Sequence, residues 1–446
     1  MIILDHYCGR TVAVLGLGAS GVATVQALLA GGAHVVAWDD NADGASLSIA
    51  LTHYEAWPWE ELEAIVISPG VPLHHPVPHP AVTLAHGHGV RITSDITLLM
   101  EACAQAQYIG ITGTNGKSTT TALMAHCLRA MGANVQCGGN IGVPALALQP
   151  LDADGIYVLE LSSYQLDSMD SGVLDIACLT NITPDHIDRH GCMDGYVHAK
   201  ERIFRGQHPQ VHAAIIAIDD EHTRHIAQHR PHAITVSAYG ASGAAWKMEG
   251  EELIDARSGE GESYDLSVIL SLVGAHNHQN ALIVIAACVS AGFDPGMIYD
   301  AMQSFGGLAH RMERVRTVDC VLCVNDSKAT NADAAAKSLG SYDNIYWIVG
   351  GVAKAGGIES LEEYMPRVRH AYCIGEAAEM FAQTLRGYNV LCTISGTLEQ
   401  AVRDAFSEAR GREGSVMLLA PACASFDQFK NFEQRGDHFK GLVASL

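Results

Sequence analysis

Residues Tyr108–Thr121, YIGITGTNGKSTTT, decide how the rest of the chain is interpreted. The apolar run Tyr108–Ile111 predicts a buried strand, and a helix is expected to begin near Lys117. Gly113 and Gly116 let the backbone between these elements curl, so that its N–H groups point inward. Together with the helix N-terminus, those groups predict a cradle for an anion such as phosphate.

The side chains that follow the turn favour a nucleotide with its metal ion. Lys117 supplies a point charge for the outer phosphates, and Ser118 or Thr119 offers a hydroxyl to Mg²⁺. The spacing departs from the usual phosphate loop, because position 111 is Ile rather than Gly. An ordinary strand–turn–helix corner is the alternative, although Gly-Lys-Ser after a buried strand is an uncommon coincidence.

Length and composition limit the class of protein. A chain of 446 residues suggests about three domains at roughly 150 residues each. Its 27 basic and 49 acidic residues give a net charge of −22, which argues against nucleic acid or a membrane surface as a partner. The 12 Cys are interpreted as scattered, reduced core thiols of a cytoplasmic protein. Neither a signal peptide nor a membrane-spanning segment is expected.

The N-terminal region predicts a second nucleotide site. The expected strand Thr11–Leu15 leads into Gly16–Gly21, a G-x-G-x-x-G turn before a helix, and the next strand, His34–Trp38, ends at Asp39 and Asp40. This fingerprint places a nucleotide on the helix N-terminus, and NAD is not the only candidate. A tight corner without a ligand is the alternative. The proline-rich stretch Pro72–Pro80 is expected to be a loop.

Several polar residues of the middle region have two interpretations each. Glu160 ends the expected strand Tyr157–Leu161 beside the phosphate loop, where it is a natural Mg²⁺ ligand, or else a buried acid paired with a base. His186, among acids, suggests metal or phosphate contact, although a surface loop is the better interpretation of that stretch alone. From its local sequence alone, Lys200 is expected to be a solvated lysine on a helix. Asn277 and Asn280 are expected to cap a helix rather than to bind a nucleobase.

The C-terminal region predicts a doubly wound parallel sheet, because expected strands alternate with helical stretches. Those strands are Val321–Val324, Ile345–Val349, Ala371–Ile374, Val390–Cys392 and Val416–Leu419. Ligands bind at strand ends in such sheets. The segments at those ends are 326–331, 350–354 and 422–425.

An ordered set of motifs runs along the chain: GTNGKST (113–119), ELSSYQL (160–166), NITPDHIDRH (181–190), GAHNHQN (274–280), HRME (310–313), NDSKATN (325–331) and PACASFDQFKNFEQRGDHF (421–439). This set resembles the Mur ligases, the ATP-dependent amide ligases of peptidoglycan precursor synthesis, and the resemblance covers the whole chain. The last two motifs point most specifically to the D-glutamate-adding branch.

The resemblance implies an α/β fold of three domains and an activity. Residues 1–96 would form a Rossmann-like domain for the UDP-substrate, 97–306 a central P-loop ATPase domain with a mostly parallel sheet, and 307–446 a Rossmann-like domain for D-glutamate and part of ATP. The implied enzyme adds D-glutamate to UDP-N-acetylmuramoyl-L-alanine through an acyl phosphate, as a cytoplasmic monomer that uses ATP and two Mg²⁺ ions.

The resemblance also implies the site residues. Those for the UDP-substrate would be Ser20, Gly21, Asp39, Asp40, Ser68, Asn140 and His186. Those for ATP would be Gly113, Thr114, Asn115, Gly116, Lys117, Ser118, Thr119, Asn277, Asn280, Arg311, Asp326 and Lys328. Metal ligands would be Ser118, Glu160, His186 and Lys200, the last as a carbamate. The catalytic residues would be Lys117, Glu160, His186 and Lys200. D-Glutamate would be held by Thr330, Lys354, Ser425 and Phe432.

The sequence departs from the family pattern at two places, and three other functions would each explain part of it. Val352 replaces an acid that some relatives have, and the loop from His186 to Lys200 is one residue shorter. A folylpolyglutamate-type ligase shares the phosphate loop but lacks a UDP-type N-terminal domain. An NAD-dependent dehydrogenase explains only residues 16–40. A non-enzymatic nucleotide switch explains only the phosphate loop.

Overall fold

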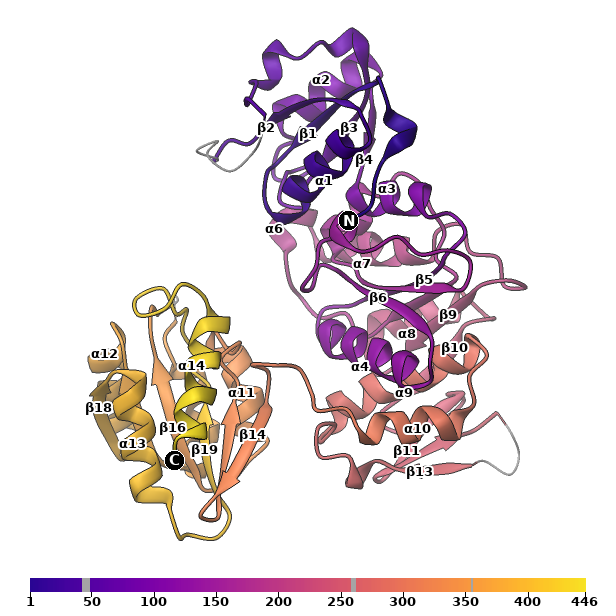
Figure 1. The fold of residues 1–446 in the computed structure, drawn as a ribbon. Helices are drawn as coiled ribbons and strands as arrows, with labels where there is room; N and C mark the ends of the chain where they lie inside the picture. Colours follow the sequence, from indigo (N-terminus) through magenta and orange to yellow (C-terminus); the bar gives the residue numbers. More distant parts are fainter. Residues whose placement is uncertain (42–48, 258–261, 354–355) are drawn as a thin grey trace. The chain divides into compact units, whose positions relative to one another are not determined.

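The computed structural model describes residues 1–41, 49–257, 262–353 and 356–446. Within these residues the chain forms three β-sheets with α-helices packed on them, as the predicted α/β class requires (Figure 1). The chain divides into two compact units, Met1–Phe305 and Gly306–Leu446. The expected boundary at 306/307 lies beside this division, whereas the further partition at residue 96 stays a prediction.

The first sheet is built from short apolar strands that pair in parallel. In spatial order they are β2 (His34–Trp38), β1 (Thr11–Leu15), β3 (Leu62–Ile67) and β4 (Arg91–Thr93). The central strands β1 and β3 are almost wholly buried, which is typical of parallel strands covered on both faces. Their carboxyl ends therefore meet at one edge, where the Gly16 turn and Ser68 lie.

The second sheet carries the phosphate loop. Its order is β13 (Ser263–Asp265), β12 (Glu252–Asp255), β11 (Trp246–Glu249), β10 (Ile234–Ser237), β9 (Ala213–Ala217), β8 (Ile176–Leu179), β5 (Gln107–Thr112), β7 (Gly155–Glu160) and β6 (Asn134–Gly139). Strands β6 to β11 pair in parallel, and only the hairpin edge β11–β12–β13 is antiparallel. The strand β5 is central and buried, so the loop after it is held at the middle of the sheet edge.

The helices of the unit Met1–Phe305 connect and cover these two sheets (Figure 1). They are α1 (Ala19–Ala30), α2 (Pro80–His88), α3 (Asp95–Ala102), α4 (Lys117–Ala130), α5 (Ser163–Ser168), α6 (Ile187–His190), α7 (Met193–Glu201), α8 (Glu221–Gln228), α9 (Ala275–Ser290) and α10 (Pro295–Gln303). On one face of the second sheet, α4 and α9 pack together in an apolar cluster with β5 and β8. That packing fixes the start of α4 beside the start of α9.

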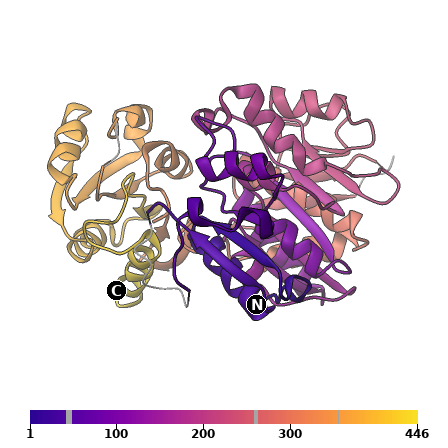
Figure 2. The ribbon, with the colours of Figure 1, turned by 90° about the horizontal axis from the view of Figure 1, so that it is seen from above.

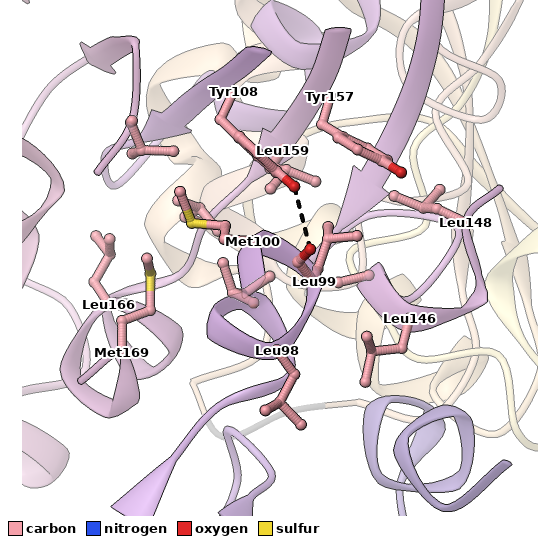
Figure 3. Packing of buried hydrophobic residues seen from close by; sticks show 14 of the residues in the cluster. Leu98, Leu99, Met100, Tyr108, Leu146, Leu148, Tyr157, Leu159, Leu166 and Met169 are labelled. Carbon is pink, nitrogen blue, oxygen red and sulfur yellow. Dashed lines mark hydrogen bonds between the residues drawn. The ribbon is translucent and has the colours of Figure 1, made fainter. Parts of the chain in front are cut away.

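One hydrophobic cluster joins the two sheets of this unit (Figure 3). Tyr108 of β5 and Tyr157 of β7 stack with ring centroids 5.2 Å apart. The Tyr108 hydroxyl donates to the Leu99 carbonyl of α3 over 3.2 Å, the bond drawn in Figure 3. Leu146 and Leu148 pack on the other side of the same cluster. The shared core explains why Met1–Phe305 is one compact unit although it contains two sheets.

The third sheet belongs to Gly306–Leu446 and is covered on both faces (Figures 1 and 2). Its order is β14 (Glu313–Val318), β15 (Val321–Asn325), β19 (Ser415–Leu419), β16 (Ile345–Gly350), β17 (Val368–Ile374) and β18 (Cys392–Gly396). Only β14 is antiparallel to its neighbour. Alternate residues of β16 enter different cores: Trp347 packs under α11 (Ala332–Gly340) and α12 (Ala378–Gly387), and Tyr346 under α13 (Leu398–Ala409) and α14 (Phe432–Ala444).

Most expected strands are confirmed within two residues of their ends, with instructive exceptions. The expected strand Val390–Cys392 is displaced, since Asn389 has φ +59° and Leu391 is exposed in the turn before β18. Edge strands β6 and β14 were not predicted, because their polar and glycine residues give no apolar alternation. The interpretation of the 12 Cys as scattered core thiols is wrong for Cys8, Cys192 and Cys320, which are exposed; Cys320 and Cys323 form a C-x-x-C spacing in which both thiols are free. No helix in the described ranges is long and apolar enough to cross a bilayer.

Candidate functional site

The phosphate loop has the backbone that its glycines predict. Gly113 has φ +150° and Gly116 has φ +85°. A Cβ on Gly113 would lie 1.8 Å from Thr180 Oγ1, and one on Gly116 would lie 2.4 Å from Asn280 Oδ1, so both positions require glycine. No side chain caps α4 at Gly116. The start of α4 is therefore a place where helix N–H groups can meet an anionic ligand.

Two of the predicted cradle amides are occupied by the protein itself. The N–H of Thr114 donates to the Asn181 carbonyl over 2.7 Å, and that of Asn115 to Asn181 Oδ1 over 2.9 Å. Thr180 Oγ1 donates to the Asn115 carbonyl over 2.6 Å. The segment after β8 thus holds the loop in place. Because the amides of Thr114 and Asn115 are bonded to Asn181, the candidate donors for an anion are those at the start of α4.

Lys117 and Lys200 converge on this loop. Lys117 Nζ donates to the carbonyls of Gly113 and Thr114 over 2.9 and 2.8 Å, and Lys200 Nζ donates to Gly113 over 2.6 Å. Lys200 is 2% exposed and lies over the Tyr196 ring, 4.6 Å from its centroid. The isolated interpretation of Lys200 as a solvated lysine is therefore wrong. Burial, and to a lesser extent the charge of Lys117, lowers the pKa of Lys200 to about 6, although the charges of Asp185 and Glu160 act to raise it.

Glu160 ends β7 as a buried carboxylate with a free oxygen. The Asn140 side chain donates to Oε1 over 2.8 Å, and Asn140 N–H donates to the Glu160 carbonyl over 2.9 Å. Among the residues that the structure describes, Oε2 has no hydrogen-bond partner and the carboxylate has no salt bridge. The alternative interpretation, that Glu160 is a buried acid paired with a base, is therefore wrong among the described residues. A buried oxygen left in this way fits a hard cation such as Mg²⁺.

His186 lies at the start of α6 with φ +50°. The Tyr164 hydroxyl lies 3.0 Å from its Nδ1, and Asp185 lies 3.4 Å from its Nε2. Across the described ranges, no three His, Cys, Asp or Glu side chains surround one point as a metal cluster would. The predicted ligand set has only two residues of those types, because Ser118 and a Lys200 carbamate supply the rest.

The two asparagines of α9 do not cap that helix, so the capping interpretation is wrong. The N-cap is Gly274, without a side-chain bond. Asn280 is 1% exposed and accepts from Thr120 Oγ1 over 3.0 Å, while its amide donates to Asn277 Oδ1 over 3.2 Å. This pair presses Asn280 against Gly116 and so supports the turn before α4.

A cavity of about 520 Å³ lies at the edge of the first sheet. Five of the predicted UDP-substrate residues line it: Ser20, Asp39, Asp40, Ser68 and Asn140. Gly21 instead packs against the glycine turn, where a Cβ would lie 1.9 Å from the Gly16 carbonyl. His186, also predicted for this substrate, makes its contacts with Tyr164 and Asp185. The cavity therefore gathers most, but not all, of the predicted set.

Some cavity residues were missed from the sequence. His79 and Gln165 also line the cavity. A histidine directly before a proline that begins a helix is a signal that was available for His79, because such a residue can cap the helix. For Gln165 a local signal was also available, because Ser162–Gln165 has the S-x-x-Q spacing of a capping box, and its side chain accepts from the Ser162 amide.

The third sheet gathers its own candidate residues. Asp326 is 5% exposed, accepts from the Met312 amide over 3.3 Å and from the Ser338 hydroxyl, and burial raises its pKa. Lys328 Nζ lies 5.5 Å from the Phe432 ring centroid, so these two predicted residues meet. Ser425 is 2% exposed in the loop after β19. Lys354 lies outside the described residues.

Arg435 is a structural residue of this region that sequence reasoning did not assign. It is 1% exposed, and its guanidinium donates to Ser327 Oγ, the Ser327 carbonyl and the Cys423 carbonyl over 2.9, 2.8 and 3.1 Å. Burial lowers its pKa to about 10, against the charges of Cys423 and Asp427. Arg435 thereby ties α14 to the ends of β15 and β19, where Asp326 and Ser425 lie.

Comparisons with known proteins find similarity to Mur ligases along the chain. Residues 111–288 match the Mur ligase middle domain, and residues 310–423 match the Mur ligase, glutamate ligase domain. The UDP-N-acetylmuramoylalanine–D-glutamate ligase of Rhodospirillum rubrum is 47% identical over 466 residues, covering 100% of this chain and 97% of the relative. The ligase of the same name from Brucella abortus is 48% identical over 463 residues, covering 100% and 98%.

Solved structures show the same fold at low identity. The UDP-N-acetylmuramate-alanine ligase of Thermotoga maritima gives a TM-score of 0.60 at 16% identity, covering 98% of this chain and 99% of that one. A crystal structure of MurF from Acinetobacter baumannii gives 0.58 at 18% identity, covering 86% and 85%. With full-length relatives far above chance identity and two matching domains, this chain belongs to the Mur ligase family.

Proposed function

We propose that this protein is an ATP-dependent ligase that joins D-glutamate to UDP-N-acetylmuramoyl-L-alanine during peptidoglycan precursor synthesis. The observation that carries the proposal is the similarity, at 46–48% identity over the full length, to relatives named as that D-glutamate ligase. The phosphate loop and the cavity are the proposed sites for the two nucleotides of such a reaction. A cytoplasmic monomer remains part of the proposal.

The start of α4 is the proposed site for the ATP phosphates. Its uncapped amides and the ammonium of Lys117 offer donors and positive charge where the phosphates would lie. Glu160 Oε2 and the Ser118 hydroxyl would hold Mg²⁺, and the carboxylate fits because its second oxygen is buried and without a protein partner. When bound, Mg²⁺ would withdraw charge from the phosphate oxygens.

The proposed chemistry answers a simple difficulty: a carboxylate resists attack by an amine. Its oxygen takes the γ-phosphoryl group of ATP, so an O–P bond forms, the bond to ADP breaks, and an acyl phosphate results. The neutral amine of D-glutamate then attacks the acyl carbon, a C–N bond forms, inorganic phosphate leaves, and the amine loses its proton. Both reactants are anionic, so Lys117 and the α4 N-terminus serve to offset their repulsion.

Lys200 is proposed to act as a carbamate. A neutral amine can attack CO₂, forming an N–C bond and releasing a proton, and the product is an anion with two oxygen ligands. Support comes from the burial of Lys200 and from its pKa, lowered to about 6, which leaves the amine neutral at pH 7 and above. His186 is proposed as the further ligand or oxyanion contact.

The remaining substrates are assigned to the other described regions. The UDP group is proposed for the cavity lined by Ser20, Asp40 and Ser68. D-Glutamate is proposed to bind Thr330, Ser425 and Phe432 with Lys354, and Lys328 beside Phe432 adds positive charge for its carboxylates. Asn277, Asn280, Arg311 and Asp326 complete the proposed ATP set.

The test is a reconstituted reaction. Purified protein with ATP, Mg²⁺, UDP-N-acetylmuramoyl-L-alanine and D-glutamate should release ADP and phosphate and form one amide, detected by mass spectrometry. L-Glutamate and D-aspartate are the matched acceptors that differ in configuration and in length. Equal use of either would contradict the D-glutamate assignment, and absence of phosphate release with all four components would contradict the ligase itself.

A further inference from the structure

A series of side-chain hydrogen bonds runs from the end of β9 to the phosphate loop. Asp219 follows β9, Gln279 lies in α9, and Asn181 follows β8. Gln279 Nε2 donates to Asp219 Oδ2 over 2.7 Å, and Asn181 Nδ2 donates to Gln279 Oε1 over 3.0 Å. Asn181 Nδ2 also donates to the Asn115 carbonyl over 3.1 Å, and its Oδ1 accepts the Asn115 N–H over 2.9 Å. Asp219 is thereby connected to the loop through two side-chain amides.

The surroundings of Asp219 require a carboxylate, because both of its oxygens face donors. Ser237 Oγ accepts the N–H groups of Tyr239 and Ala241 over 3.2 and 2.9 Å. Its own proton therefore goes to Asp219 Oδ1, which lies 2.7 Å away. The Ala238 N–H donates to Oδ2 over 3.0 Å. An amide at this position would turn its NH₂ group towards one of these donors.

The carboxylate determines the orientation of both amides. Because an ionised acid can only accept, Gln279 faces Asp219 with its nitrogen and Asn181 with its oxygen. That oxygen can accept only from the Asn181 nitrogen, so the Asn181 oxygen is left to face the Asn115 N–H. Gln279 is 7% exposed, and a reversed amide there would leave buried polar groups without partners. The acid at one end therefore decides which atom faces the loop at the other.

Helix α9 supports the phosphate loop at two successive residues. Asn280 lies against Gly116, where an added Cβ would be 2.4 Å from its Oδ1. The neighbouring Gln279 supports Asn115 through Asn181. The loop needs such support, because glycine allows the backbone many other conformations. A loop that is already ordered loses less conformational entropy when a ligand binds.

We propose that Gln279 is a positioning residue for the ATP phosphates, which, oriented by Asp219, holds Asn181 and the phosphate loop ready for ATP. The proposal rests on the proposed function, which assigns those phosphates to the start of α4. The role of Gln279 is indirect, because its two bonds are to Asp219 and Asn181. It therefore concerns the affinity for ATP and not the chemical step that follows.

Two substitutions and their combination test this role. Gln279→Met keeps the length of the side chain and removes both bonds. Asp219→Asn keeps the shape of the acid and removes the reason for the amide orientation. Gln303→Met is the matched control, since Gln303 is an exposed residue of α10 that donates to Asp300 of the same helix over 3.3 Å. Each full-length protein is titrated calorimetrically with ATP and Mg²⁺ and with the UDP-substrate. Its kcat, KM values and melting temperature are also measured.

Gln279→Met and Asp219→Asn should each weaken ATP binding by about tenfold, the size of one hydrogen bond, and Gln303→Met should not. The affinity for the UDP-substrate should stay unchanged, and kcat at saturating ATP should change by less than about twofold. The double variant should bind ATP no more weakly than Gln279→Met, because Asp219 acts through Gln279.

Three results would overturn the proposal. The first is an unchanged ATP affinity in Gln279→Met, and the second is an equal loss of affinity for both substrates together with a lower melting temperature. The third is a double variant whose loss is the product of the two single losses. Gln279→Met alone decides the matter if Asp219→Asn does not fold. Failure of the wild-type protein to bind ATP would instead overturn the assignment of the phosphate loop.

Discussion

Lys117 and Lys200 donate to the same backbone oxygen, the carbonyl of Gly113, over 2.9 and 2.6 Å. Two ammonium groups on one acceptor repel each other, and Lys200 is the buried member. Its pKa is lowered accordingly, whereas Lys117 extends from the first turn of α4. Lys200 is therefore available as a neutral amine.

Lys117→Ala should remove turnover but leave the UDP-substrate bound. The loss of a charge aimed at the phosphates is expected to lower kcat by at least roughly 100-fold. The cavity at the first sheet does not include Lys117, so calorimetry with the UDP-substrate should give a dissociation constant near that of the wild-type protein. Loss of both ligands in the variant would indicate misfolding or a shared site.

Lys200→Ala should lower activity by roughly 10–100-fold or more, because it removes a proposed metal ligand. A short carboxylate such as acetate can occupy the space left by the side chain and supply the missing oxygens. Steady-state assays with increasing acetate should then show partial recovery in Lys200→Ala and none in the wild-type protein. Activity like that of the wild type without any added acid would exclude the carbamate role.

Glu160→Gln should raise the Mg²⁺ concentration needed for half-maximal activity. The substitution keeps the shape of the side chain and its acceptor for Asn140, but replaces Oε2, the oxygen without a protein partner, by an amide nitrogen. A decrease in activity of roughly 10–100-fold is expected from the loss of a ligand oxygen. Mg²⁺ titrations of activity, with circular dichroism as the folding control, test this. The same Mg²⁺ dependence in both proteins would contradict the metal role.

Gly116→Ala and Gly132→Ala form a matched pair at the two ends of α4. Both glycines have φ +85°, so alanine costs about 1–2 kcal/mol of backbone strain at either position. Only at Gly116 would the new Cβ meet another atom, Asn280 Oδ1 at 2.4 Å, whereas nothing lies within 4 Å at Gly132. Urea unfolding should show the larger destabilisation for Gly116→Ala, and only this variant should lose ATP binding. Equal losses would show that Asn280 yields without cost.

Asp95 should make stability fall as the pH rises from about 4 to 6. Burial raises its pKa from 3.8 to about 6, so the folded protein keeps a proton that the unfolded chain has lost. Fewer protons bound in the unfolded state mean a free energy of unfolding that decreases with pH. The full effect is about 3 kcal/mol at most, at 1.36 kcal/mol per pH unit.

Asp95→Asn removes this titration without changing the size of the side chain. The free energy of unfolding of Asp95→Asn minus that of the wild-type protein should increase as the pH rises from 4 to 6. Above pH 6 this difference should stay constant. Urea denaturation of both proteins between pH 4 and 8 measures it. Parallel curves for the two proteins would show that Asp95 does not hold the proton.

The sequence predicts those features that neighbouring residues encode. Strands β1 and β2 were located to the residue, because each is an apolar run that ends at a glycine or an acid. The turn between β5 and α4 was also predicted correctly, since Gly113 and Gly116 adopt positive φ. The edge strand β14 was missed, because half of its residues are exposed and two of these, Arg314 and Arg316, are charged.

The tertiary structure alone decides what surrounds each polar side chain. From its local sequence Lys200 was expected to be a solvated lysine, and Arg435 was given no role. The fold buries both side chains. Lys200 donates to a carbonyl, and Arg435 to a hydroxyl and carbonyls, of segments distant in sequence. Gln279 was also given no role, and only the fold places it between Asp219 and Asn181, 60 and 98 residues away in sequence. Burial and hydrogen-bond partners depend on which segments pack together, and local sequence sets only the elements that pack.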